Sequence, residues 1–454
     1  MESHGASGEV GNESAASEVM KSSSAREQQR ALTQKLMEQI VAPSNLNQAF
    51  KRVKSNKGAP GIDGMTVEQL PKWISAHKES LIASLLNGTY QPKAVRKVSI
   101  PKPQGGAREL GIPTVIDRLI QQAILQVLQP IYEPMFSENS YGFRPGRSAH
   151  DAVSQASRYV SEGKSFVVDI DLEKFFDRVN HDILMSRLAR SIGDSRLLRL
   201  IRRYLNAGMM FEGVVCRREE GTPQGGPLSP LLSNILLDDL DRELETRGHS
   251  FCRYADDCNI YVRSERAAKR VLASVTLWLS AELKLSVNQN KSAASRVGER
   301  KFLGHRIYPS GHIGLAPESL IRFKTKIREA TKRRTPRPIE RVITELTPLL
   351  RGWLNYYRLC KMKNLTEDLD CWIRRRLRTI RLHQCKRAFG TKQFLVREGV
   401  ATRQAWYVAL SGKNTWRLAH TPQAHQAMNT KWFEERGLHS LHKHFRSLTL
   451  SGTA

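Results

Sequence analysis

Three aspartates stand where the sequence predicts that short apolar strands end. Asp256 and Asp257 lie in the middle of the β-prone segment 251–262, so they should occupy the tip of a hairpin. Asp171 ends a second β-prone run, residues 166–171. Turns favour aspartate without any function, which is the alternative explanation for each site alone. Three carboxylates from two strands would repel one another unless hard cations bound them, and they suit two Mg²⁺ ions about 4 Å apart.

The charge balance indicates what such a site would act on. The formal net charge is +28 and the isoelectric point is about 10.1. From Lys301 onward there are 31 Lys and Arg residues against 10 Asp and Glu. This excess predicts a polyanionic partner, with nucleic acid favoured over an anionic membrane. No apolar run reaches about 18 residues and no secretory signal is present, so we expect no membrane partner.

The six cysteines form no C-x-x-C pair, which gives a zinc site little support. In a chain of this length they do not suggest a disulfide framework either. A reducing cytoplasm is the simpler expectation.

Seven short motifs follow one another over roughly residues 95–310. In chain order they are 108–114 (RELGIPT) with Asp117 and Arg118, 141–148 (YGFRPGRS), 171–176 (DLEKFF), 221–230 (GTPQGGPLSP), 254–257 (YADD), 288–292 (NQNKS) and 302–304 (FLG). Together they resemble the motifs of reverse transcriptases encoded by bacterial group II introns. A single tetrapeptide can match by chance, but seven in the right order do not.

The resemblance implies a role for each acidic site. Asp171, Asp256 and Asp257 would hold two Mg²⁺ ions, with the main-chain carbonyl of Leu172 as a further oxygen ligand. Lys291 would protonate the pyrophosphate leaving group, as a general acid. Asp169 has the strand parity of Asp171 and is a back-up ligand, although a structural role is the stronger interpretation.

The same resemblance implies a deoxynucleotide pocket. Lys102 and Arg108 would neutralise the triphosphate, although loop lysines are usually only solvated. Gln224 would line the pocket beside glycines that let the backbone approach closely. Phe176 would reject a ribose 2′-hydroxyl and so select dNTPs, while Phe175 is expected to be core.

The last third places the chain within that family. Residues 350–358 (LRGWLNYYR) resemble its thumb, or maturase, segment, although an aromatic core helix is the simpler explanation for part of it. The expected RNA-phosphate contacts are Arg351, Arg358, Arg374, Arg375, Arg376 and Arg378. In the tail, Trp416, Arg417 and Lys431 are expected to contact DNA, with packing of a small helical cap as the alternative for the tryptophan.

These observations predict an α+β right-hand polymerase with fingers, a palm built on an antiparallel sheet, a helical thumb and a small C-terminal DNA-binding region. The expected divisions are a disordered tail (1–29), an N-terminal extension (30–94), fingers and palm (95–315), the thumb or maturase domain (316–388) and the DNA-binding region (389–454). Asp117 is expected to cap an amphipathic helix, and helices are expected after the glycine-rich segment 225–227 and beyond Pro317.

The function implied is an RNA-directed DNA polymerase that copies group II intron RNA at a DNA target and also assists splicing by binding that RNA. The tail lacks cysteine pairs, and so resembles the endonuclease-free bacterial subclass called class C. Expected partners are intron RNA, target DNA and dNTPs, in a bacterial cytoplasm at the nucleoid. The alternatives are a non-mobile RNA-binding splicing cofactor and a domesticated or defence-associated reverse transcriptase.

Overall fold

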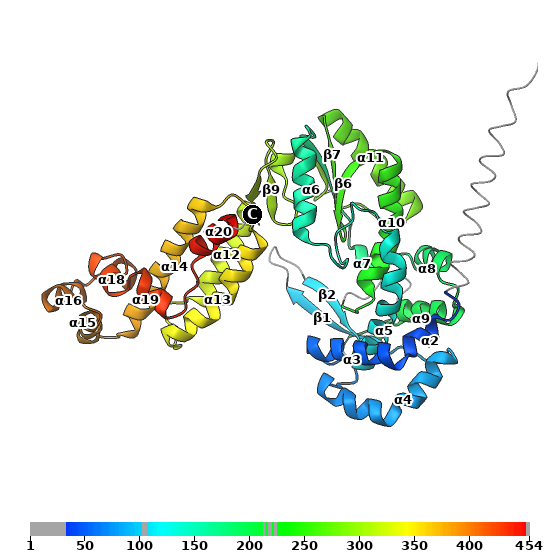
Figure 1. The fold of residues 1–454 in the computed structure, drawn as a ribbon, viewed down its shortest axis with the longest axis horizontal. Helices are drawn as coiled ribbons and strands as arrows, with labels where there is room; N and C mark the ends of the chain where they lie inside the picture. The colour runs from blue at the N-terminus through cyan, green and yellow to red at the C-terminus, as the bar shows by residue number, and fades with distance from the viewer. Residues whose placement is uncertain (1–32, 102–106, 212–213, 217–219, 222–224, 451–454) are drawn as a thin grey trace, which may run out of the picture. The chain divides into compact units, whose positions relative to one another are not determined.

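The computed structural model describes residues 33–101, 107–211, 214–216, 220–221 and 225–450, which form two compact units (Figure 1). The first unit combines residues up to 152 with 168–294, and the second combines 153–167 with 295 onward. The expected tail, 1–29, lies outside the described residues. The described residues combine helices with three separate sheets that contain antiparallel strand pairs, which confirms the α+β class.

Helices make up most of the first unit. They are α2 Leu36–Val41, α3 Pro43–Asn56, η1 Val67–Gln69, α4 Leu70–Leu86, α5 Val115–Tyr132, η2 Glu133–Met135, α7 Phe175–Arg178, α8 His181–Ser191, α9 Ser195–Asn206, α10 Ser229–Thr246 and α11 Glu265–Glu282, while α6 Ala149–Ser161 runs into the second unit. In α9 the apolar positions recur at helical spacing, so that Leu197, Leu200 and Ile201 are buried.

The start of α5 differs from the prediction. Thr114 is the N-cap, because its hydroxyl accepts a hydrogen bond from the Asp117 amide at 3.1 Å. Asp117 lies one turn further in and is 1% exposed, where its carboxylate accepts hydrogen bonds from Thr114, Tyr90 and Tyr204. The expectation that Asp117 caps the helix was therefore wrong, and its burial raises the pKa of this carboxyl.

A four-stranded sheet combines two strands that precede the first acidic motif in sequence with two that follow it. Its strand order is β2-β1-β4-β5, with β1 Val95–Pro101, β2 Ala107–Ile112, β4 Met209–Phe211 and β5 Val214–Cys216. The predicted strands β1 and β2 pair antiparallel, whereas β4 joins β1 in parallel. Because β4 comes more than a hundred residues later, this sheet brings the segment before the 221–230 motif beside the fingers strands.

The acidic motifs share a second sheet of order β6-β7-β3-β8. Its strands are β3 Phe166–Asp171, β6 Ser250–Tyr254, β7 Asp257–Val262 and β8 Ala293–Arg296. As predicted, β6 and β7 form an antiparallel hairpin, with Tyr254 opposite Asp257 and only two residues at the turn. Since β3 lies next to β7, both acidic segments belong to neighbouring strands.

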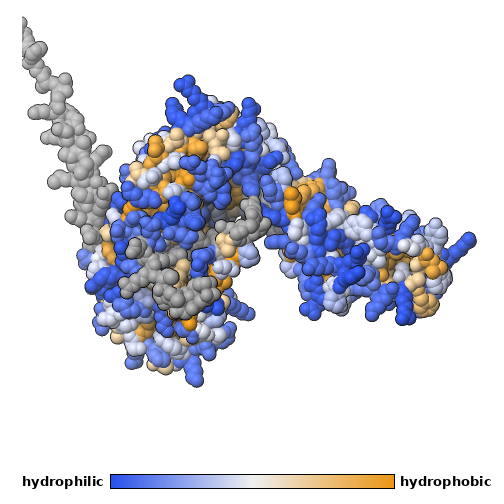
Figure 2. All heavy atoms as spheres, turned by 180° about the vertical axis from the view of Figure 1, so that it is seen from behind, coloured by the Kyte–Doolittle hydropathy of each residue, from blue (hydrophilic) through white to orange (hydrophobic). Residues whose placement is uncertain are grey.

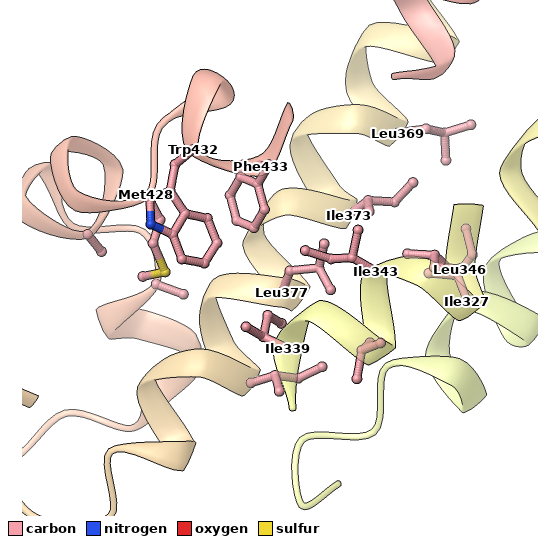
Figure 3. Close-up of a cluster of buried hydrophobic side chains, with 14 of the residues drawn as sticks. Ile327, Ile339, Ile343, Leu346, Leu369, Ile373, Leu377, Met428, Trp432 and Phe433 are labelled. Carbon is pink, nitrogen blue, oxygen red and sulfur yellow. The ribbon is translucent and has the colours of Figure 1, made fainter. Parts of the chain in front are cut away.

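The second unit is helical apart from a small hairpin. Its elements are η3 Val297–Glu299, β9 His305–Ile307, β10 Ile313–Leu315, α12 Pro317–Ala330, α13 Ile339–Tyr356, α14 Lys363–Gln384, α15 Ala388–Arg397, α16 Thr402–Ala409, α17 Thr415–Leu418, α18 Pro422–Ala427, α19 Thr430–Glu435 and α20 Leu441–Leu450. One apolar cluster joins these helices, with Ile343 of α13, Leu377 of α14 and Phe433 of α19 in its interior (Figure 3). Each buried side chain of this kind contributes about 1.5–3 kcal/mol. None of the described helices is long and apolar enough to cross a bilayer.

Candidate functional site

The hairpin tip crowds several carboxylates together. Asp256 and Asp257 follow Ala255, whose φ of +58° turns the chain sharply between the strands. Asp257 is exposed as a residue, but the surrounding protein withdraws water from its carboxyl group. That desolvation, followed by the negative charges of Asp256, Asp169 and Asp171, raises the pKa of Asp257 to about 7. The carboxylates of both acidic motifs therefore act on one another.

The motif 288–292 holds the end of β3. The Asp171 amide donates to the hydroxyl of Ser292 at 2.9 Å, and the Asn288 amide donates to the Asp171 carbonyl at 2.8 Å. Lys291 Nζ lies 3.3 Å from Asp171 Oδ2. Its positive charge partly offsets the carboxylate cluster and also lowers the pKa of Asp257. The predicted lysine thus lies beside the predicted metal ligands.

The donor set suits a hard divalent cation. Among the described residues, no group of three or more His, Cys, Asp or Glu side chains forms a ready metal site. The acidic motifs nevertheless lie on neighbouring strands, and after desolvation the charges of Asp256, Asp169 and Asp171 raise the pKa of Asp257; oxygen donors of this kind are what Mg²⁺ prefers. Asp171, Asp256 and Asp257 would hold the metal, and its charge would relieve this repulsion.

Two glycines of the 221–230 motif lie close to the backbone of other segments. A Cβ on Gly221 would lie 2.7 Å from the Phe176 carbonyl oxygen, so glycine lets this segment approach α7 closely. A Cβ on Gly225 would lie 2.8 Å from the carbonyl oxygen of Gly111 in β2. Gly221 therefore lies beside the Phe176 segment and Gly225 beside strand β2, and the nucleotide pocket stays a prediction.

Phe176 and Phe175 are both buried, at 8% and 2% exposure, and their rings meet edge to face with centroids 5.2 Å apart. The slightly greater exposure belongs to Phe176, and its gate role stays a prediction. Leu172 is also buried, at the end of β3. Lys102 and Gln224, along with the side chain of Arg108, lie outside the described residues.

In the second unit, two motifs that are far apart in sequence meet. The Leu303 carbonyl in the 302–304 turn accepts a hydrogen bond from the Tyr356 hydroxyl at 3.0 Å. A Cβ on Gly304 would lie 2.7 Å from the Tyr357 hydroxyl oxygen, so this turn also requires glycine. Beside it lies a groove of about 640 Å³ lined by Arg322, Lys326 and aromatic rings of α13. The turn is thus fixed by the helix that carries the 350–358 motif.

Comparisons with known proteins agree with the seven motifs over residues 95–310 and with the 350–358 motif. Residues 100–307 match the family model for reverse transcriptase (RNA-dependent DNA polymerase), and residues 320–399 match the maturase-specific domain of group II introns. Protein YkfC of Escherichia coli (strain K12) is 35% identical over 315 residues, which cover 60% of this chain and 83% of YkfC. The group II intron-encoded protein LtrA of Lactococcus lactis subsp. cremoris is 38% identical over 216 residues, which cover 46% of this chain and 35% of LtrA. A partial Cas6-RT-Cas1--Cas2 complex aligns at 28% identity over 55% of this chain and 43% of its own, with a TM-score of 0.36.

The chain belongs to the family of group II intron-encoded reverse transcriptases and maturases. Enzymes of this family are metal-dependent RNA-directed DNA polymerases, which agrees with the acidic palm. The maturase-specific match begins in α12 and ends just after α15. It therefore covers most of the helices on which the RNA-contacting arginines were predicted.

One of those maturase arginines is structural. Arg378 is 4% exposed, and it donates to the Met428 carbonyl at 2.9 Å while its guanidinium lies over the Phe433 ring. Burial lowers its pKa to about 10. The prediction that Arg378 contacts RNA was wrong, because this position of α14 faces the core of the unit.

The other predicted arginines remain accessible to differing degrees. Arg351 is exposed, and Arg358 lines a hollow of about 860 Å³. Arg374, Arg375 and Arg376 are half-buried, and Arg375 stacks on Trp416 with 4.2 Å between guanidinium and ring. Hydrophilic side chains cover most of the visible face of this unit (Figure 2).

The exposed aromatic residues of the tail are not those that the sequence singled out. Trp416 is half-covered by Arg375, whereas Phe389 is 56% and Tyr407 is 78% exposed. Lys392 lies within 5.7 Å of the Phe389 and Trp406 ring centroids. Arg417 and Lys431 are exposed as expected. Aromatic residues at the starts and ends of short helices resemble core positions in sequence, so only their measured exposure reveals this surface.

Proposed function

We propose that this protein copies group II intron RNA into DNA at a DNA target and assists splicing by binding the same RNA. The observation that carries the first half is that neighbouring strands bring Asp171 to the turn with Asp256 and Asp257, where desolvation, followed by the nearby negative charges, raises the pKa of Asp257 to about 7. Such a cluster in an otherwise basic chain suits nucleotidyl transfer on a polyanion.

In the proposed reaction, Asp171, Asp256 and Asp257, together with the main-chain carbonyl of Leu172, would hold two Mg²⁺ ions through their oxygens. When bound there, Mg²⁺ would lower the pKa of the primer 3′-hydroxyl and stabilise negative charge on the triphosphate. Lys102 and Arg108 orient the triphosphate, while Gln224 and Phe176 shape the pocket around the base and sugar. Lys291, held beside Asp171, donates a proton to the departing pyrophosphate.

The maturase function is assigned to the second unit. Arg351 and Arg358 on α13 and the turn that follows it, together with Arg374, Arg375 and Arg376 on α14, would contact RNA phosphates, since this unit carries most of the positive charge. Bacterial relatives and the basic charge support action in the cytoplasm at the nucleoid, where intron RNA and DNA are both present.

The C-terminal helices would hold target DNA. Arg417 and Lys431 would contact its backbone near Trp416, and Phe389, Trp406 and Tyr407 would stack on unpaired bases, with Lys392 close to phosphate. Replacing Phe389 and Tyr407 by Ser should weaken binding of single-stranded DNA without changing primer extension on a preformed duplex. Unchanged affinity would remove this surface from the proposal.

The two halves of the proposal are tested together on one purified protein. Primer extension on an RNA template should require dNTPs and Mg²⁺, and a self-splicing-deficient group II intron transcript should splice faster when the protein is added. Splicing assistance without any DNA synthesis would instead favour a non-mobile splicing cofactor. DNA synthesis without intron-RNA affinity would favour a domesticated or defence-associated reverse transcriptase.

A further inference from the structure

The motif 141–148 has no role in the reaction described above. The same holds for Arg253, which directly precedes the 254–257 motif. Both contact the backbone that leads into the turn with Asp256 and Asp257. Ala255, at the first position of that turn, has a φ of +58°, which L-residues other than glycine rarely adopt. A backbone in this conformation persists only where contacts with surrounding residues stabilise it, and Ala255 has several such contacts.

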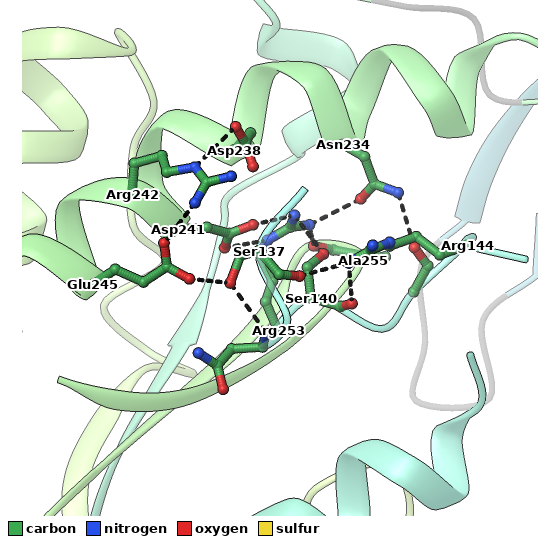
Figure 4. Close-up of polar contacts among 12 residues, drawn as sticks. Ser137, Ser140, Arg144, Asn234, Asp238, Asp241, Arg242, Glu245, Arg253 and Ala255 are labelled. Atoms are coloured by element: carbon green, nitrogen blue, oxygen red, sulfur yellow. Dashed lines mark hydrogen bonds and ion pairs between the residues drawn. The ribbon is translucent and has the colours of Figure 1, made fainter. Parts of the chain in front are cut away.

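Arg253 is the most prominent of those surroundings (Figure 4). Its side chain is 1% exposed, and it forms a two-pronged ion pair with Asp241 of α10, at 2.7 Å from Nε and 2.6 Å from Nη2. Nη1 donates to the Asn234 side chain at 3.0 Å and to the Ala255 carbonyl at 2.9 Å, and Nη2 donates to the Ser140 hydroxyl at 2.7 Å. All five N–H groups of the guanidinium are therefore used.

The 141–148 motif closes the other side of the turn. Main-chain hydrogen bonds join Arg253 to Asn139 and Tyr141, each at 2.9 Å. A Cβ on Gly142 would lie 2.2 Å from the Ala255 nitrogen, so the two backbones are in direct contact. The Asn234 amide, which binds Arg253 through its oxygen, donates through its nitrogen to the Gly142 carbonyl at 2.9 Å.

Arg144 stabilises the segment around Ser140 through side-chain hydrogen bonds. Its guanidinium donates to the Ser140 carbonyl at 2.9 Å and to Glu133 at 2.8 Å, and the residue is 8% exposed. Two buried arginines thus brace the same few residues, one from the 141–148 motif and one from the strand before the catalytic turn.

We propose that Arg253 is a positioning residue for the catalytic carboxylates, and that Gly142 is its counterpart in the 141–148 motif. Arg253 holds the Ala255 carbonyl in the left-handed turn, and Gly142 leaves room for the Ala255 backbone. Together they fix the backbone conformation of the turn and thereby the orientation of the Asp256 and Asp257 carboxylates. This also explains why a glycine-containing motif more than a hundred residues upstream accompanies the acidic turn.

If the Arg253–Asp241 ion pair had only a structural role, its replacement would affect activity only through stability. Replacing a buried ion pair by apolar residues of similar size is often neutral for stability, whereas removing one partner is strongly destabilising. A double variant, Arg253→Met with Asp241→Leu, can therefore fold while lacking the donor to Ala255. If the pair only stabilises the fold, activity should recover together with the melting temperature.

The first experiment compares the parent, Arg253→Met and the double variant by thermal melting, RNA binding and primer extension at several Mg²⁺ concentrations. In the double variant we expect the melting temperature and RNA affinity to return close to parent values. We expect kcat to stay at least about tenfold low and half-saturating Mg²⁺ to rise, because displaced carboxylates bind metal poorly. Recovery of kcat to within about twofold of the parent, with unchanged Mg²⁺ dependence, would overturn the proposal.

A second pair of variants decides the matter if the double variant does not fold. Gly142→Ala keeps every charge but places a Cβ 2.2 Å from the Ala255 nitrogen, whereas Gly298→Ala is the matched control, because its Cβ would meet only Pro309 Cδ at an ordinary 3.7 Å. We expect Gly142→Ala to lower kcat at least about tenfold and raise the Mg²⁺ requirement, with the control unchanged. Parent-like kinetics in Gly142→Ala would refute the role of the turn.

This inference rests on the proposed polymerase function, and the two can fail separately. If the parent protein does not extend a primer, the proposed function fails. If the parent is active and Asp256→Asn abolishes its activity, but Gly142→Ala does not alter kcat or Mg²⁺ dependence, only the positioning role fails.

Discussion

At the scale of single residues, the site is governed by crowding of like charges. Asp257 carries the clearest sign of it, because desolvation and three neighbouring carboxylates raise its pKa to about 7. Lys291 offsets part of that charge from 3.3 Å away from Asp171. A metal-free palm is therefore under electrostatic strain that substrate-bound Mg²⁺ would relieve.

This strain predicts how metal affects stability. In EDTA, Asp257→Asn should melt at a higher temperature than the parent, because it removes one of the repelling charges. Mg²⁺ should raise the melting temperature of the parent more than that of the variant. Differential scanning fluorimetry with and without Mg²⁺ measures both effects, and a variant less stable than the parent in EDTA would contradict the crowding argument.

Phe176 is expected to exclude ribonucleotides. Phe176→Val should open space beside the sugar and allow rNTP incorporation, which a primer-extension assay with single rNTPs detects. Phe175→Val is the matched control: it removes a neighbouring buried ring and should lower stability, by about 1–4 kcal/mol for poorer core packing, without changing sugar selection. If the Phe175 variant alone accepts rNTPs, the gate has been assigned to the wrong ring.

At the scale of elements, helix α14 illustrates how one basic run serves two purposes. Arg374, Arg375 and Arg376 lie on partly exposed positions, whereas Arg378 points to Met428 and Phe433 in the core. The two kinds of arginine therefore differ in what their replacement should do.

Changing Arg374, Arg375 and Arg376 to Gln should flatten the salt dependence of RNA binding, by about one unit of log–log slope for each phosphate that is no longer neutralised. Arg378→Gln is the control, and it should lower stability, by about 1–3 kcal/mol for an unpaired buried carbonyl, while leaving the slope unchanged. Binding measured at several salt concentrations separates these outcomes. An unaltered slope in the triple variant would show that this face does not bind RNA.

The elements also show what could be predicted from the sequence. Strand β3 and the β6–β7 hairpin were predicted because β-prone apolar residues and acidic turn residues mark them locally. Strands β4 and β5 were missed, since three-residue strands exist only through pairing with β1 and with each other. Arg253 looked like an ordinary strand residue, and Arg378 like its basic neighbours, because burial of a charge depends on a partner far away in sequence. The seven motifs predicted the palm. The contacts of Arg253 and Gly142 with Ala255 could be found only in the three-dimensional structure.

At the scale of the whole molecule, the chain divides its chemistry between two units. The acidic cluster and the nucleotide-pocket motifs lie in the first unit, and most of the excess positive charge lies in the second. The reverse transcriptase and maturase-specific matches follow the same order along the chain. DNA synthesis and RNA binding should therefore be separable by mutation.

The most direct test measures RNA-templated primer extension and intron-RNA affinity for the parent, Asp256→Asn and a control, Asp182→Asn, whose carboxylate is 84% exposed and pairs only with Arg202 among the ion pairs described. Asp256→Asn should lower the extension rate by at least about 10³-fold, since several kcal/mol of metal-mediated charge stabilisation are removed, yet leave RNA affinity within about twofold. The control should match the parent in both assays. Extension by Asp256→Asn at the parental rate would contradict the assignment of the acidic palm as the catalytic centre.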